Sequence, residues 1–216
     1  MGLAIPPHAG EPVARRGCAL AEAQAVVIMV HGRGASAASI LELAPALDHP
    51  GVAFLAPGAA GGSWYPRSFM APIEQNEPGI TSGIAVVHDL MDEVLDAGIP
   101  GERIVLLGFS QGACLVSTAA QRRPGRFGAV IAYSGGLIGP PGTLWLEQGS
   151  LHGTPVFLGC SDRDAHIPEE RVRSTAGVFE RMGATVTMRI YEGMGHLVNE
   201  DEIAFTRELL ALIAAG

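Results

Sequence analysis

The pentapeptide Gly108-Phe109-Ser110-Gln111-Gly112 constrains the fold of this chain most, because it joins two segments of different character. The apolar run 103–107 indicates a short buried strand, and residues 113–120 are typical of a helix. A G-x-S-x-G pattern at a strand-to-helix turn is the sequence form of a nucleophile elbow, which exposes the serine hydroxyl. Glycines two residues either side of the serine remove side chains that would collide with nearby backbone. Alone, the pattern also fits an ordinary turn.

The rest of the chain alternates strand-length apolar runs with amphipathic helices. Strands are expected at 25–30, 52–56, 128–133, 155–159 and 185–191, with an edge strand at 13–16; helices are expected at 37–47, 81–97, 169–182 and 199–214. This alternation predicts an α/β protein with a mostly parallel sheet and helices on both faces. With 216 residues and no internal repeat or linker, we expect a single domain over 1–216, in which 1–24 forms a leading segment rich in Pro, Ala and Gly.

Composition narrows the classes of partner. The formal net charge is −8, and the only adjacent basic pairs are at 15–16 and 122–123, which argues against binding of nucleic acid. No apolar run approaches the roughly 18 residues that span a bilayer, so no stable membrane anchoring is expected. Three cysteines cannot all pair, and their apolar surroundings suit a reducing compartment. We therefore predict a cytoplasmic location.

A serine nucleophile needs a base, and the base needs an acid to orient it. His196 follows the expected strand 185–191, and Asp164 follows the expected strand 155–159. The carboxyl ends of parallel strands meet at one edge of a sheet, and the order Ser110, Asp164, His196 is that of an α/β-hydrolase. Asp162 follows the same strand as Asp164. We favour Asp164 as the acid, and expect Asp162 to bond backbone N–H groups of its own loop.

An acyl-transfer site also needs donors for the oxyanion of the tetrahedral intermediate. One donor is expected to be the backbone N–H of Gln111, where the positive end of the following helix also faces the serine. The second is expected from the glycine-rich turn 31–34, as the backbone N–H of Arg33.

Four motifs, in order along the chain, resemble the phospholipase/carboxylesterase family of α/β-hydrolases, which includes small carboxylesterases and acyl-protein thioesterases. They are H-G-R-G-A at 31–35, G-F-S-Q-G-A at 108–113, D-x-x-I-P at 164–168 and G-M-G-H at 193–196. The resemblance extends from about residue 25 to the C-terminus. It implies a triad of Ser110, Asp164 and His196, an oxyanion hole at Arg33 and Gln111, no cofactor, and often a homodimer.

One position departs from the thioesterase-like members, which usually carry an apolar residue where this chain has Arg33. Together with N-E-P-G at 76–79, this arginine points to a less characterised esterase branch. Because 216 residues leave no room for a large helical lid, we expect an open site and predict short or medium acyl chains. Arg33 and Arg67 are expected near its mouth, and a positive rim attracts anions, so we also predict some tolerance of acidic substrates.

Apolar and aromatic residues of two long loops are the candidates for the substrate pocket: Trp64, Tyr65, Phe69, Leu137 and Ile138. Asp162, Asp164 and His166 lie in one short loop without a second His/Cys cluster, so we expect no metal site. The sequence thus predicts a serine carboxylesterase acting on a small-molecule ester or thioester. Two alternatives are a dienelactone-hydrolase-like lactonase, whose group generally uses cysteine, and a non-catalytic binding protein of the α/β-hydrolase fold.

Overall fold

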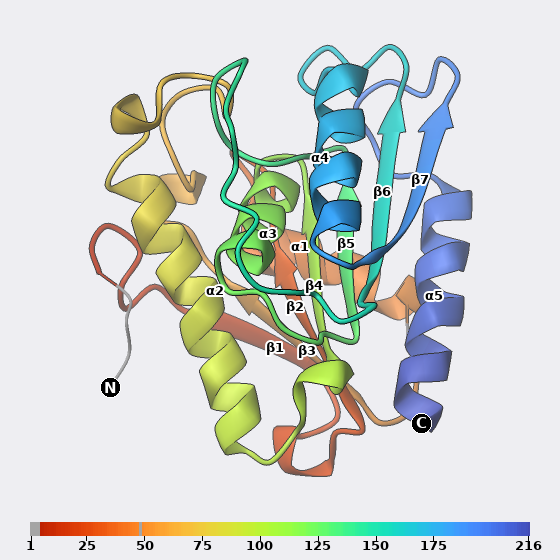
Figure 1. The fold of residues 1–216 in the computed structure, drawn as a ribbon. Coiled ribbons are helices and arrows are strands. Elements are labelled where there is room, and N and C mark those ends of the chain that lie inside the picture. The colour runs from red at the N-terminus through yellow and green to blue at the C-terminus, as the bar shows by residue number, and fades with distance from the viewer. Residues whose placement is uncertain (1–4, 48) are drawn as a thin grey trace.

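The computed structural model describes residues 5–47 and 49–216, and its strands form one sheet in the order β1-β3-β2-β4-β5-β6-β7 (Figure 1). The strands are β1 (Val13–Gly17), β2 (Ala25–Val30), β3 (Val52–Pro57), β4 (Ile104–Phe109), β5 (Ala129–Tyr133), β6 (Pro155–Ser161) and β7 (Thr185–Tyr191). Only the β1–β3 pairing is antiparallel. The predicted α/β architecture is therefore confirmed. Residues 1–4 of the predicted leading segment lie outside the described residues.

Helices cover both faces of the sheet. In Figure 1, α2 (Gly79–Asp96), α3 (Gln111–Arg122) and α4 (Glu169–Arg181) lie on the near face, and α1 (Ala37–Ile40) and α5 (Glu200–Ala215) on the far one. Strand β2 is buried on both faces of the sheet, since all six of its residues are buried. Val26, Ile28 and Val30 belong to the same core as residues of α2, α3 and α4, while the residues between them belong to the core shared with α1 and α5.

The predicted helix 37–47 is wrong in its second half. Helix α1 ends at Ile40, and a 3-10 helix continues over Leu41–Leu47 with Pro45 inside it. Proline has no N–H to donate and its ring clashes with the carbonyl four residues earlier, so an α-helix cannot continue through this position. The expected starts are present: Ser36 caps α1, and Asn199 with Glu202 forms a capping box on α5.

The topology brings four loops to one edge of the sheet, at the top of Figure 1, toward which β6 and β7 point. These loops follow β2, β4, β6 and β7, which run parallel to one another. Ligand sites of such sheets lie at the carboxyl ends of the strands, so the polar residues singled out from the sequence share this edge.

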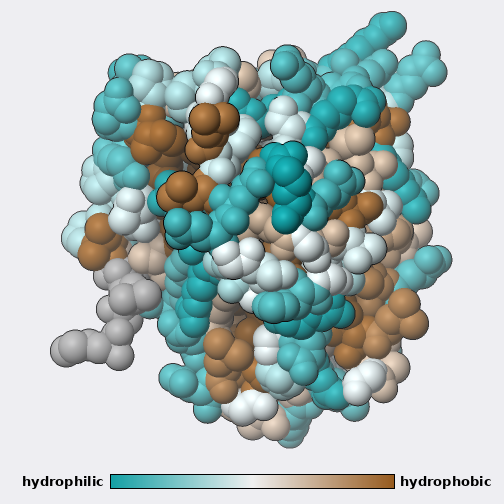
Figure 2. Space-filling view, viewed as in Figure 1, coloured by the Kyte–Doolittle hydropathy of each residue, from teal (hydrophilic) through white to brown (hydrophobic). Residues whose placement is uncertain are grey.

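Among the described residues, no helix has the length and apolar character needed to cross a bilayer. The face shown in Figure 2 is mostly hydrophilic, with separate smaller hydrophobic patches.

Candidate active site

Ser110 lies at a sharp turn between β4 and α3, with φ 55° and ψ −118°. This backbone conformation is rare for a residue with a side chain, and it persists because the neighbours leave room for it. A Cβ at Gly108 would overlap the backbone of Gly112, and a Cβ at Gly112 would overlap the carbonyl oxygen of Val30. The two glycines of the pentapeptide are therefore steric requirements of the turn.

A continuous chain of hydrogen bonds joins Ser110, His196 and Asp164. His196 Nε2 lies 2.8 Å from Ser110 Oγ, and His196 Nδ1 lies 2.7 Å from Asp164 Oδ2. The histidine comes from the loop between β7 and α5, and the aspartate from the loop after β6. The structure thus brings together three residues that are widely separated along the chain.

The carboxylate of Asp164 is held by more than His196. Its side chain is 0% exposed, and Oδ1 accepts hydrogen bonds from the backbone N–H groups of His166 (2.8 Å) and Ile167 (3.0 Å). Burial by itself raises the pKa of Asp164, but the hydrogen bonds from His196, His166 and Ile167 outweigh burial and hold that pKa below its ordinary value. Asp164 is therefore an ionised acceptor at neutral pH.

Asp162 has a different place. Its Oδ1 accepts a hydrogen bond from the N–H of Gly193 at 2.7 Å, and so joins the loop after β6 to the loop that carries His196. The sequence led us to expect bonds within its own loop, whereas this bond crosses to the neighbouring one. Of the two aspartates, it is the carboxylate of Asp164 that contacts His196.

The turn 31–34 lies against Ser110, since a Cβ at Gly32 would be 3.3 Å from Ser110 Cβ. Buried His31 fixes the turn: its Nδ1 is 2.8 Å from the carbonyl oxygen of Gly32, and its Nε2 accepts from the N–H of Ala59. Burial lowers the pKa of His31, in keeping with a neutral ring that donates from one nitrogen and accepts at the other. Its role here is to support the turn.

Two predicted donors, the N–H groups of Arg33 and Gln111, belong to residues that line the pocket beside Ser110. Gln111 is the first residue of α3, where N–H groups have no partner within the helix. Its side chain anchors the facing loop: Oε1 accepts from the N–H of Trp64 (2.9 Å), and Nε2 donates to the carbonyl of Tyr65 (2.8 Å).

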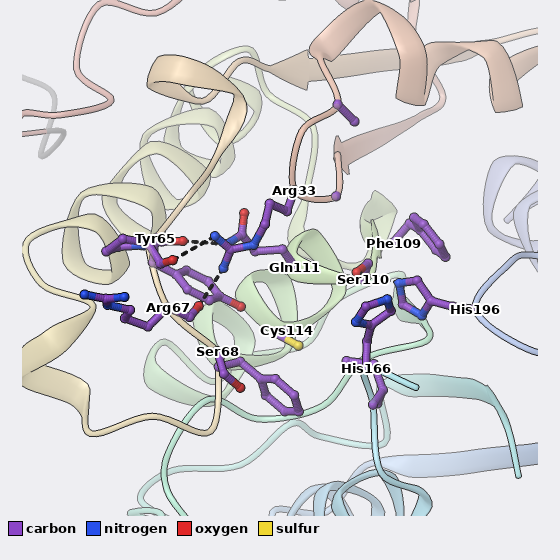
Figure 3. A pocket seen from close by; sticks show the side chains of 15 residues that line it. Arg33, Tyr65, Arg67, Ser68, Phe109, Ser110, Gln111, Cys114, His166 and His196 are labelled. Carbon is purple, nitrogen blue, oxygen red and sulfur yellow. Dashed lines mark hydrogen bonds between the residues drawn. The ribbon is translucent and has the colours of Figure 1, made fainter. Parts of the chain in front are cut away.

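Ser110 and His196 line a pocket of about 470 Å³, which Figure 3 shows from close by. Of the five predicted pocket residues, Tyr65 and Phe69 line it, and Trp64, Leu137 and Ile138 do not. Trp64 instead packs on His31 and donates its Nε1–H to the His31 carbonyl. Its indole therefore supports the turn at His31, and the prediction that Trp64 lines the pocket is corrected.

Leu137 and Ile138 are likewise core residues. Both are almost fully buried, and their backbone N–H groups donate to Thr175 and Thr118, on α4 and α3 respectively. Sequence alone could not separate an apolar loop residue that faces a pocket from one that faces the core.

Several lining residues were missed as pocket residues, among them Phe109, Cys114 and His166. The His196 ring lies between two of them, with its centroid 5.0 Å from that of Phe109 and 4.7 Å from that of His166. Phe109 and His166 lie within the motifs at 108–113 and 164–168, and Cys114 directly follows the first of them, which was the available signal. Within the described ranges, no cluster of three or more His, Cys, Asp or Glu residues could hold a metal ion.

Comparison with known proteins decides the family. The profile of the phospholipase/carboxylesterase family matches residues 17–214. The chain belongs to the phospholipase/carboxylesterase family. A solved phospholipase/carboxylesterase from Dyadobacter fermentans is 37% identical with a TM-score of 0.89, over 94% of this chain and 97% of that one.

Curated relatives of this chain include acyl-protein thioesterase 1 of Eremothecium gossypii, 30% identical over 65% of this chain and 62% of that protein. Acyl-protein thioesterase 1 of Kluyveromyces lactis is 29% identical over 84% of this chain and 88% of that protein. The chain spans less than two thirds of the first three curated relatives it matches, at 62%, 56% and 60% of their lengths.

Proposed function

We propose that this phospholipase/carboxylesterase family member is a serine hydrolase of carboxylic esters or thioesters. The observation that carries the proposal is the hydrogen-bonded chain from Ser110 through His196 to Asp164, with Ser110 in an elbow at the mouth of a pocket. The names of the relatives support ester or thioester hydrolysis as the reaction class.

In the proposed mechanism, Ser110 Oγ attacks the carbonyl carbon of the substrate while His196 Nε2 takes its proton. The tetrahedral oxyanion accepts hydrogen bonds from the N–H groups of Arg33 and Gln111. When the intermediate collapses, His196 returns the proton to the departing alcohol or thiol, leaving an acyl group on Ser110. Water, deprotonated by His196, then attacks the acyl-enzyme, and the carboxylic acid leaves as Ser110 regains its proton.

Asp164 acts throughout as the partner of His196. Hydrogen bonding keeps its carboxylate ionised and fixes Nδ1–H of the ring toward it, so that Nε2 is the nitrogen free to accept the serine proton. The carboxylate also stabilises the imidazolium that forms in each half-reaction. No step needs a cofactor.

The test is hydrolysis of a panel of p-nitrophenyl esters and the matching thioesters, from acetyl to dodecanoyl, by the wild-type chain and Ser110→Ala. We expect turnover of short or medium chains by wild type, and a loss of several orders of magnitude in Ser110→Ala. Turnover above a few per cent of the wild-type rate in pure Ser110→Ala protein would contradict the mechanism. The cytoplasmic location and a homodimer stay predictions.

A further inference from the structure

The pocket carries a charge opposite to that of the whole chain. Arg33, Arg67, His166 and His196 line it, and none of the Asp and Glu residues that the structure describes does, although the formal net charge of the chain is −8. The nearby carboxylate of Asp164 is buried and bonded to His196. A substrate in this pocket therefore meets cationic or neutral groups.

The Arg33 guanidinium is fixed at the pocket wall by neutral acceptors. It donates to Ser63 Oγ (3.3 Å) and to the carbonyl oxygens of Pro66 (3.0 Å) and Arg67 (2.6 Å). A guanidinium has five N–H donors, so these bonds leave two for a ligand. They also hold the positive charge in place without neutralising it. By contrast, five other arginines of the described chain pair with carboxylates: Arg15, Arg123, Arg173, Arg181 and Arg189.

A second arginine, Arg171, places a positive charge behind the pocket wall. Arg171 is 5% exposed and donates to the carbonyl oxygens of Leu137 and Gly139, each at 2.7 Å. Its guanidinium lies 5.5 Å from the ring centroid of Phe69, which lines the pocket. These acceptors are also neutral, so the charge of Arg171 acts across a poorly solvated wall, where screening is weak.

The geometry also indicates which part of a substrate meets Arg33. Figure 3 shows Arg33 and Tyr65 on one side of Ser110, and His196 with His166 on the other. Because His196 hands its proton to the departing alcohol or thiol, the leaving group lies on the His196 side. The acyl part then extends toward Tyr65, whose ring centroid is 5.9 Å from the Arg33 guanidinium carbon.

We propose that the Arg33 side chain is an anion-recognition group, and that the preferred substrate is an ester whose acyl part carries a carboxylate. This inference rests on the proposed function and names its substrate class: half-esters or half-thioesters of short dicarboxylic acids. Arg67 is not part of the recognition group, since Figure 3 shows its side chain directed away from Ser110.

The experiment compares benzyl half-esters of the dicarboxylic acids from malonic to adipic with neutral benzyl esters of equal length, in which a methyl ketone replaces the carboxylate. Release of benzyl alcohol gives kcat/KM for each. In wild type we expect the best anionic ester to exceed its neutral counterpart about tenfold or more, the size of one charge-assisted hydrogen bond. The advantage shrinks as ionic strength rises, because salt screens exposed charge.

Three variants separate charge from loop structure. Arg33→Gln removes the charge while keeping an amide donor and the backbone N–H, and should bring the anionic-to-neutral ratio close to one. Ser63→Ala removes one loop contact of Arg33 and should keep the ratio and its salt dependence. Arg122→Gln changes the net charge by the same amount at an exposed position on α3, and should also keep both.

Each ratio is measured within one variant, so a general loss of activity cancels. Equal rates for the paired esters in wild type, or a ratio unchanged in Arg33→Gln, overturns the inference while hydrolysis itself upholds the proposed function. If no ester is hydrolysed and Ser110 forms no adduct with a fluorophosphonate, the proposed function fails, and this inference fails with it.

Discussion

Glu202 should make the stability of this protein fall as pH rises, contrary to the usual behaviour of a carboxylate. The residue lies in the first turn of α5 and is 0% exposed. One carboxyl oxygen accepts the N–H of Asn199 at 2.9 Å, and the other has no hydrogen-bond partner within the described residues. Burial raises the pKa of Glu202, and the hydrogen bond from Asn199 offsets part of that rise. The pKa therefore increases from its ordinary 4.5 to about 7.

A carboxyl group with a higher pKa in the folded state binds its proton more readily there than in the unfolded chain. The contribution of Glu202 to the free energy of unfolding therefore decreases as pH rises from about 4.5 to about 7, and is constant above that. The difference between 4.5 and about 7, at about 1.4 kcal/mol per pH unit, gives roughly 3 kcal/mol.

The change to make is Glu202→Gln, which keeps an acceptor for Asn199 and cannot ionise. Urea unfolding at pH values from 4.5 to 8.5 gives the free energy of unfolding for both proteins. We expect nearly equal values at pH 4.5, and an advantage of about 3 kcal/mol for the variant at pH 8.5. Comparing the two proteins cancels the contributions of His31 and His88, whose pKa values burial lowers.

Glu200→Gln, on the same turn but exposed, is the matched control and should show no such trend. A difference between wild type and Glu202→Gln that is constant across this pH range would refute the reasoning, because Glu202 would then ionise alike in both states.

Two further predictions concern the site. Asp164→Asn is expected to lower kcat by about four orders of magnitude with KM little changed, because His196 loses its ionised partner. Asp162→Asn is expected mainly to lower the melting temperature, since it weakens the bond to Gly193; the reverse outcome in steady-state kinetics contradicts the assignment. Gly112→Ala should lower the free energy of unfolding by more than about 3 kcal/mol, or prevent folding, because its Cβ overlaps the Val30 carbonyl. Gly125→Ala, where a Cβ meets open space, should not, and equal urea midpoints would refute the steric argument.

Residues whose positions follow from strand ends could be predicted from the sequence. Ser110, Asp164 and His196 each follow a strand of the parallel part of the sheet, and parallel strands end at one edge. The same reasoning placed the turn 31–34 beside Ser110. Backbone requirements of this kind leave glycines and apolar runs as visible signals in the sequence.

Side-chain direction within long loops could not be predicted. Trp64 and Tyr65 are neighbours, yet Trp64 supports the turn at His31 while Tyr65 lines the pocket. That difference depends on which loop carbonyls Gln111 and Arg33 bind, and such contacts join residues about 30 to 50 positions apart. Arg33 illustrates the limit, because its charge was visible in the sequence and its attachment to the carbonyls of Pro66 and Arg67 was not.

The central claim, that Ser110 is the nucleophile activated by His196, is tested most directly by intact-protein and peptide mass spectrometry after treatment with a fluorophosphonate. The account predicts one adduct, on the peptide that contains Ser110, which forms quickly in wild type, far more slowly in His196→Ala, and not at all in Ser110→Ala. An unlabelled wild-type protein, or an adduct at another residue that forms equally well in Ser110→Ala, would contradict it.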